Sequence, residues 1–204
     1  MKILVVAAMQ NEMKAIKNWI KSANIKSNLD IEYLCLWIWN YDTIYSLVDN
    51  VKNSTEPIFI RNIWICWYRN SENKKIIEPI QVANVINIHT EKELIVPPFV
   101  QIAPLKTCFS SEHIIYEKPL LKNDISDECN ECYFDMESRG VEFVALKYKY
   151  PCLILKVPFD FIWEETRHYN GQASNNIMYD MLSNLPYHEY LEKILSWMKL
   201  QESL

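Results

Sequence analysis

Glycine is nearly missing from this sequence, which has Gly140 and Gly171 as its two glycines in 204 residues. Glycine-rich loops let the backbone approach phosphate or sugar closely, because a glycine has no side chain to block the approach. A bias in genome composition is an alternative explanation for the low glycine count, but such a bias alone should not remove glycines that the backbone geometry requires. The near absence of glycine therefore argues against a phosphate-binding loop.

The sequence also lacks an excess of positive charge and any long apolar run. Its formal net charge of -5 argues against a duplex nucleic-acid partner, which needs clustered Lys and Arg. No apolar run approaches the ~18 residues of a membrane span. The apolar stretch that follows Lys2 ends at Gln10, and no small-residue cleavage site follows it. We therefore expect no membrane association and a cytoplasmic location.

The six cysteines do not form a pattern typical of a disulfide scaffold or a metal site. In a chain of this size without a secretion signal, reduced thiols are the expected state. Cys129 and Cys132 have the spacing of zinc ligands, but zinc would need two further ligands and the sequence has no second pair of this kind. We therefore interpret the pair as a chance spacing and expect no metal.

What the sequence does contain is typical of one α/β domain over residues 1–204. Half of the residues are hydrophobic, with seven tryptophans, so the chain is long and apolar enough for a substantial core. Apolar runs typical of strands alternate with segments of helical spacing, which favours a single-domain three-layer sandwich with a mixed, largely parallel central sheet. The expected strands cover residues 2–8, 31–39, 57–68, 105–109, a segment ending near 134, and 152–157, with extended segments at 76–88 and 94–103. The expected helices cover residues 9–20, 44–51 (with Asp42 or Thr43 as N-cap), 118–127, 135–148 (with Asp135 as N-cap), 177–185 and 190–198.

Three acidic residues each follow a short apolar run: Glu12, Glu137 and Asp160. If those runs are parallel strands, the three carboxylates meet at the carboxyl edge of one sheet, where open α/β sheets place their ligands. Each residue also has a simpler interpretation. In that interpretation, Glu12 and Glu137 are carboxylates in the first turn of a helix, where the helix dipole stabilises negative charge, and Asp160 is an exposed loop aspartate. Glu137 shares the inward stripe of Val141 and Val144, so a ligand hydroxyl could be its partner.

Four blocks of the sequence resemble the nucleoside phosphorylase and nucleosidase superfamily, especially the methylthioadenosine/S-adenosylhomocysteine nucleosidases. Residues 1–13 (MKILVVAAMQNEM) resemble the opening strand and acidic turn of that family. Residues 135–141 (DMESRGV) are similar to its "(D/E)ME(S/G)xxV" helix start. Residues 151–160 (PCLILKVPFD) are similar to its "PxxxxRxxSD" strand, and residues 110–112 (SSE) stand where an "SxD" turn precedes the purine-stacking segment.

The resemblance implies a nucleoside phosphorylase-like fold and roles for particular residues. Glu12 would activate the attacking water, Asp160 would protonate the leaving purine, and Glu137 would bind the ribose hydroxyls. The other ligand-binding residues expected are Met136, Ser110, Ile114, Phe134, Phe159 and Trp67. The family implies a cytoplasmic homodimer or higher homo-oligomer that takes a small purine nucleoside and requires no cofactor.

The chain departs from that family where the family's glycine-rich loops belong. Residues 65–70 (ICWYRN) and 39–42 (WNYD) contain no glycine, Lys156 replaces the family's arginine, and Phe159 replaces its serine. Loss of the phosphate cradle argues most strongly against phosphorolysis. Two hypotheses stay open: a divergent nucleosidase that hydrolyses the N-glycosidic bond, or a non-catalytic descendant that binds a purine-type ligand or a protein partner. Trp67 and Tyr68 either line a reshaped pocket or belong to the core.

Overall fold

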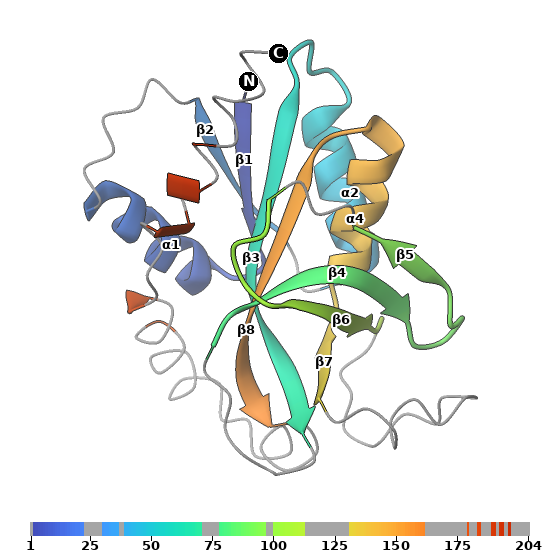
Figure 1. Cartoon of the computed structure of the whole chain (residues 1–204). Helices are drawn as coiled ribbons and strands as arrows, with labels where there is room; N and C mark the ends of the chain where they lie inside the picture. The colour runs from blue at the N-terminus through green and yellow to red at the C-terminus, as the bar shows by residue number, and fades with distance from the viewer. Residues whose placement is uncertain are drawn as a thin grey trace.

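The computed structural model describes residues 2–22, 30–36, 39–70, 78–96, 100–112 and 131–161, together with the separate positions 179, 183–184, 189–190, 192–193 and 196. Strands and helices alternate along the first part of this chain, as the sequence predicts (Figure 1). The strands are β1 (Lys2–Ala7), β2 (Ile31–Cys35), β3 (Ile58–Asn70), β4 (Ile80–Asn87), β5 (Glu93–Ile95), β6 (Leu105–Ser110), β7 (Glu131–Asp135) and β8 (Cys152–Phe161). The helices are α1 (Gln10–Ser22), α2 (Asn40–Val51) and α4 (Ser138–Tyr148).

The strands form one sheet of mixed strand direction, which confirms the predicted α/β class and the predicted mixed sheet. The strand order is β2-β1-β3-β7-β6-β4-β5, and β8 pairs with both β3 and β4. β1, β2, β3 and β8 run parallel to one another, and β4, β6 and β7 form a second parallel group. The two groups meet antiparallel where β3 pairs with β7 and where β4 pairs with β8. The expectation that all three acidic residues follow parallel strands is therefore wrong for Glu137, because β7 is antiparallel to β3.

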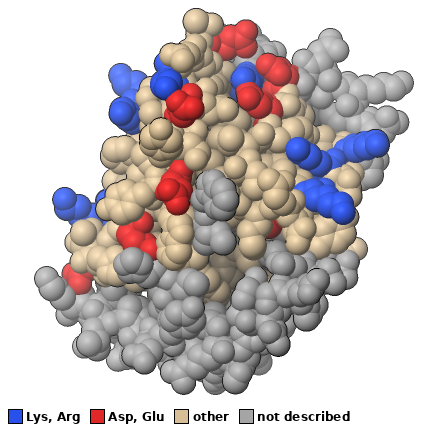
Figure 2. Space-filling model, turned by 180° about the vertical axis from the view of Figure 1, so that it is seen from behind, with Lys and Arg blue, Asp and Glu red and all other residues tan. Residues whose placement is uncertain are grey.

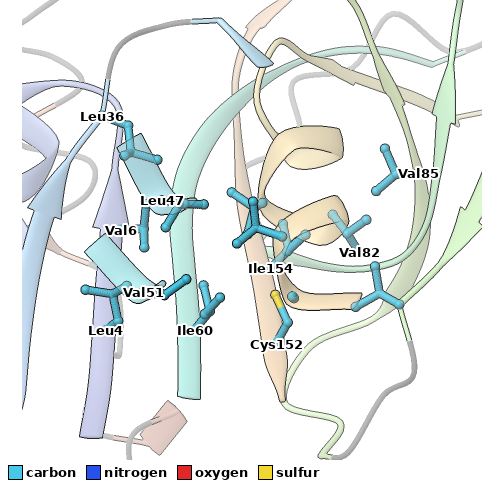
Figure 3. Close-up of a cluster of buried hydrophobic side chains, with 14 of the residues drawn as sticks. Leu4, Val6, Leu36, Leu47, Val51, Ile60, Val82, Val85, Cys152 and Ile154 are labelled. Atoms are coloured by element: carbon cyan, nitrogen blue, oxygen red, sulfur yellow. The ribbon is translucent and has the colours of Figure 1, made fainter. Parts of the chain in front are cut away.

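Side chains alternate between the two faces of the sheet, and each face packs against helices. On one face, Leu4, Val6 and Ile154 form a buried apolar cluster with Leu47 and Val51 of α2 and with side chains of α4 (Figure 3). On the other face, Ile3 and Val5 pack against Met13 and Ile16 of α1. This alternation explains why β1 is apolar from Ile3 to Ala7, since a strand covered on both faces has no polar side.

Gly140 allows α2 and α4 to pack closely against each other. A Cβ atom at this position would lie 2.6 Å from the backbone oxygen of Asn40 and 2.9 Å from Cγ2 of Thr43. Both distances are shorter than carbon–oxygen and carbon–carbon contacts allow, so a larger residue would push the helices apart. One of the chain's two glycines therefore stands where the backbone of α2 leaves no room for a side chain.

The structure corrects several predicted boundaries and caps. The N-cap of α2 is Trp39, so Asp42 and Thr43 lie inside the helix and the predicted caps are wrong. The N-cap of α4 is Glu137 and not Asp135, which is the last residue of β7. β5 shares two residues, Leu94 and Ile95, with the extended segment predicted at 94–103, and β8 continues past Val157 to include Asp160. The predicted helix at 118–127 lies outside the described residues, as do most positions of the two C-terminal helices.

Candidate functional site

The ends of β7 and β8 meet beside the same residue of β3. Trp67 is paired on one side with Phe134 of β7 and on the other with Asp160 of β8. The pairing of β8 shifts by one residue at this point, because Cys66 faces Pro158 and Trp67 faces Asp160, so Phe159 is the extra residue of a bulge. β7 runs in the opposite direction, so Phe134 lies at the level of Asp160, and Asp135, the last residue of β7, lies further back along β8, within reach of Lys156. This geometry brings the turn before α4 beside β8 even though the strands are not all parallel.

Glu12 is fully buried in the first turn of α1. Its Oε2 accepts a hydrogen bond of 2.8 Å from the backbone N–H of Met9, and its Oε1 accepts one of 3.4 Å from the N–H of Ile65 on β3. The first bond is the backbone contact of a capping box, in which a glutamate reaches back to the start of its own helix. Burial raises the pKa of Glu12 from 4.5 to about 7, although these two N–H groups and the charge of Lys156 act in the opposite direction. Near neutral pH this carboxyl group can both accept and release a proton.

Glu137 is 5% exposed, which confirms that it points inward as predicted. Its Oε2 accepts a hydrogen bond of 3.3 Å from the N–H of Met136, and it makes no side-chain cap of α4. Burial raises the pKa of Glu137 well above its usual value, and the negative charges of Asp135 and Glu12 raise it further, while Lys156 lowers it. Because Glu12, Asp135 and Lys156 all influence Glu137, the four ionisable groups form one buried cluster.

Asp135 and Lys156 form a buried ion pair inside this cluster. Nζ of Lys156 on β8 lies 2.5 Å from Oδ2 of Asp135, and both side chains are inaccessible to solvent. The same Oδ2 accepts hydrogen bonds from the hydroxyl of Ser138 and, at 2.9 Å, from its backbone N–H. Asp135 therefore accepts the hydrogen bonds that an N-cap side chain usually accepts, although the N-cap position of α4 is Glu137, two residues later.

The aromatic residues predicted to bind the ligand lie around this meeting point. Phe134 is buried and packs against Phe109, with ring centroids 5.4 Å apart, and the half-buried Trp67 belongs to the same cluster. Phe159 lies on the α1 side, where it packs with Ala15 and Val157. Asp160 is placed by its backbone beside Trp67, and its side chain lies outside the described residues.

The other residues predicted to bind the ligand are Met136, Ser110 and Ile114. Met136 is buried in the turn between β7 and α4. Ser110 is fully buried at the end of β6, and its hydroxyl accepts a hydrogen bond of 3.1 Å from the amide of Asn40. Ile114 lies outside the described residues. The structure thus brings Glu12, Glu137 and Met136 to one buried cluster, sets Phe134, Phe159 and Trp67 on the strands around it, and ties Ser110 to the start of α2.

Sequence reasoning missed three features of this region. Asn40 connects α2 to Ser110 and, through a bond of 2.9 Å from the Gly140 N–H to its Oδ1, to α4. Glu142 on α4 is 1% exposed, neither of its carboxylate oxygens has a hydrogen-bond partner, and burial raises its pKa to about 7. A surface hollow of about 580 Å³ lies beside the start of α2, lined by Trp39, Tyr41, Asp42, His89 and Glu112. Of these three features, Glu142 is the one that the sequence could have indicated, because it is an acidic residue between the apolar residues Val141 and Phe143.

The surface charges, the cysteines and the helices of the described residues show whether these residues form a charged patch, a disulfide, a metal site or a membrane span. Basic and acidic side chains are interspersed on the face that Figure 2 shows. The five cysteines in the described ranges are free thiols, as expected, and no three His, Cys, Asp or Glu side chains in these ranges are grouped as metal ligands. No helix in the described part of the chain has both the length and the apolar character that a membrane crossing requires.

Comparisons with known proteins place this fold among nucleosidases. No family model and no curated protein sequence matches the chain. Solved structures do match. The nucleosidase MTAN of Chlamydia trachomatis has a TM-score of 0.66 at 18% identity, covering 96% of this chain and 98% of that one. The 5'-methylthioadenosine/S-adenosylhomocysteine nucleosidase of Neisseria meningitidis, in complex with methylthio-immucillin-A, has a TM-score of 0.70 at 8% identity, covering 93% and 98%. A mutant futalosine hydrolase of Helicobacter pylori has a TM-score of 0.64 at 12% identity, covering 90% and 99%. The chain therefore has the fold of these nucleosidases.

Proposed function

We propose that this chain is a divergent nucleosidase that hydrolyses the N-glycosidic bond of a purine nucleoside or thio-nucleoside. The observation that carries this proposal is the buried pair of carboxyl groups, Glu12 and Glu137, whose pKa values are both raised, in a nucleosidase fold. Titratable groups with strongly perturbed pKa values concentrate at functional sites. The three-layer sandwich, the cytoplasmic location and the homodimer or higher homo-oligomer expected from the sequence belong to the same proposal.

Each acidic residue has a role that suits this reaction. Breaking the C–N bond develops positive charge on the sugar, which nearby carboxylates stabilise. Glu12, with a pKa of about 7, removes a proton from the attacking water, and Glu137 accepts hydrogen bonds from the sugar hydroxyls. Asp160 then gives a proton to the leaving purine. No step uses inorganic phosphate, in agreement with the absence of glycine from β3, whose final residues 65–70 are ICWYRN.

A second function, binding of a purine-type ligand without catalysis, is favoured by two observations. Both carboxylate oxygens of Glu12 already accept backbone hydrogen bonds, as a structural capping residue would. Trp67 and Tyr68 stand where the resemblance predicts glycines, and Tyr68 is almost fully buried in the core. Both observations are compatible with a protein that keeps the acidic cluster and does not catalyse a reaction.

An assay of free purine release distinguishes the two functions. Concentrated protein is incubated with a panel of purine nucleosides and thio-nucleosides, and released base is measured with a coupled enzyme. We expect release from at least one member, and a decrease in rate of ~10²-fold or more for Asp160→Asn. Asp49→Asn, which changes an exposed carboxylate of α2, is the matched control and should keep the rate. If no panel member releases base, the nucleosidase proposal is rejected, and a thermal shift with the same panel tests binding alone.

A further inference from the structure

Asn40 is a buried polar residue at the start of α2, and its side chain joins α2 to β6 and to α4. It is 1% exposed. Its amide group donates hydrogen bonds of 3.1 Å to the hydroxyl of Ser110, at the end of β6, and to the backbone oxygen of Ser111. Its Oδ1 accepts a hydrogen bond of 2.9 Å from the backbone N–H of Gly140 in α4. Both polar atoms of this buried side chain therefore have partners, as burial requires.

The contacts of Asn40 need a donor and an acceptor in one short side chain. The N–H of Gly140 can only donate and the backbone oxygen of Ser111 can only accept, so an ionised aspartate would satisfy one of them and a leucine neither. The close approach depends on Gly140, because a Cβ atom there would lie 2.6 Å from the backbone oxygen of Asn40. The side chain thus connects the first residue of α2 to the first turn of α4, two helices that lie side by side (Figure 1).

The hydrogen bond from Gly140 is a helix cap that comes from another helix. Gly140 is the third residue of α4, so its N–H is one of the first four that have no acceptor within a helix. The N-cap side chain usually accepts this bond, but Glu137, which occupies the N-cap position of α4, makes no such bond. The N–H of Ser138 goes to the carboxylate of Asp135, and the N–H of Gly140 goes to Asn40. Residues outside the N-cap position therefore cap α4.

This arrangement leaves the carboxylate of Glu137 available for other partners. Within the described ranges its hydrogen-bond donor is the N–H of Met136, at 3.3 Å. An ionised carboxylate has about four acceptor positions, so further positions remain for the hydroxyl groups of a ligand. The segment that Asn40 holds also fixes the turn before Glu137, since the N–H of Ser111 donates a hydrogen bond of 2.8 Å to the backbone oxygen of Asp135.

We propose that Asn40 is a positioning residue, which caps α4 from α2 so that the carboxylate of Glu137 stays available to the sugar hydroxyls of a nucleoside. In this role Asn40 does not touch the ligand. The part that concerns the sugar rests on the proposed function, whereas the cap is a property of the ligand-free protein. Without Asn40, the N–H of Gly140 lacks its acceptor, and Glu137 in the N-cap position is placed to accept it instead. A purely structural residue would not distinguish a ligand with a sugar from one without.

The first test measures the cap in ligand-free protein. Asn40→Ala removes both the donor and the acceptor, whereas Asn40→Asp keeps an acceptor for Gly140. Asn50→Ala, near the end of the same helix, is the matched control. Amide hydrogen exchange at Gly140 is followed by NMR and compared with exchange in β1, which reports global stability. We expect Asn40→Ala to accelerate exchange at Gly140 relative to β1 by about five-fold or more, as loss of a helix cap does, and the other two variants to change it by less than about two-fold.

The second test compares a ligand that has a sugar with one that does not. Dissociation constants for adenosine and for adenine, its free base, are measured by calorimetry in an Asp160→Asn background, in which hydrolysis is slow. We expect Asn40→Ala to weaken adenosine binding by about ten-fold, as loss of a hydrogen bond to a charged group does, and to leave adenine binding within about two-fold. Asn40→Asp and Asn50→Ala should leave both constants within about two-fold on the same argument. In purine release, the same difference appears for Asn40→Ala as a higher KM with a smaller change in kcat.

Three results overturn the proposal: unchanged exchange at Gly140 in Asn40→Ala, unchanged adenosine binding, or equal weakening of adenosine and adenine, which is the behaviour of a purely structural residue. If Asn40→Ala does not fold, Asn40→Ser, whose side chain is one atom shorter, is measured in its place with the same outcomes. If the unmodified protein binds neither adenosine nor another nucleoside of the panel, the proposed function fails and the role toward the sugar fails with it. Exchange at Gly140 then still decides whether Asn40 caps α4.

Discussion

The starts of α1 and α4 each carry a buried glutamate, and the two glutamates differ in their partners. At α1, Glu12 accepts two backbone hydrogen bonds, of 2.8 and 3.4 Å, and its pKa is raised to about 7. At α4, Glu137 accepts one bond of 3.3 Å and lies near the charge of Asp135, and burial raises its pKa well above the ordinary value. Titratable groups with strongly perturbed pKa values are typical of sites that perform acid–base chemistry. The comparison shows that N–H donors and neighbouring charges, in addition to burial, act on the two carboxyl groups differently.

The largest expected effect is on catalysis, where the two glutamates should behave differently. Glu12→Gln removes the base, and we expect kcat to fall by ~10²- to 10⁴-fold. Glu137→Gln keeps a hydrogen-bonding side chain beside the sugar, so we expect KM to rise by roughly ten-fold with a smaller change in kcat. Steady-state kinetics on a substrate from the purine-release panel separates the two. Equal losses of kcat in both variants would contradict the division of roles.

Next in size is the ion pair that supports the α4 start and has no equivalent at α1. Asp135→Ala removes the carboxylate that is paired with the buried Lys156 and the oxygen that accepts two hydrogen bonds from Ser138, so we expect a loss of about 3–5 kcal/mol in the free energy of unfolding. Urea denaturation measures it. The matched control is Asp49→Ala, which breaks the exposed pair with Lys52 and should cost less than about 1 kcal/mol. A similar small loss at both positions would show that the buried pair does not support the turn.

The pH dependence of stability tests the α1 start by itself. Glu12 has a pKa of about 7 in the folded protein against 4.5 as its ordinary value, so the folded state binds its proton more tightly than the unfolded chain. Its contribution to stability is complete below about pH 4.5 and is lost as the pH rises through 7. We expect a loss of about 3 kcal/mol across this window, measured as the difference in unfolding free energy between the unmodified protein and Glu12→Gln. A difference that grows with pH would have the wrong sign and would refute the raised pKa.

The smallest expected effect concerns the residue three positions after each glutamate, which is Ala15 in α1 and Gly140 in α4. Gly140→Ala places a Cβ 2.6 Å from the Asn40 backbone oxygen, so we expect a loss of about 1–3 kcal/mol in the free energy of unfolding. Ala15→Gly has no such contact to relieve, and the lower helix propensity of glycine costs about 1 kcal/mol. Denaturation of both variants gives the two losses. A Gly140→Ala protein as stable as the unmodified chain would mean that α2 and α4 can separate at little cost.

The sequence predicted the α/β class and the inward direction of Glu137, because both follow from the spacing of apolar residues. Periodicity carries no information on strand direction, so the antiparallel entry of β7 beside β3 was not predictable. The caps failed for a related reason. Asp135 and Asp42 have the right chemistry for an N-cap, but tertiary contacts with Lys156 and the close packing of α2 on α4 decide where each helix begins. The buried state of Lys156 was likewise hidden, since a lysine in a strand is usually exposed.

A crystal structure of the protein with adenine bound tests the central claim most directly, namely that Glu12 and Glu137 border a site for a nucleoside. The account predicts adenine beside Trp67, with the Asp160 carboxyl within hydrogen-bond distance of the purine and with space for a sugar next to Glu12 and Glu137. The opposite result is an indole ring of Trp67 that fills this space, or acidic side chains that point away from one another. Either arrangement would contradict the nucleosidase assignment.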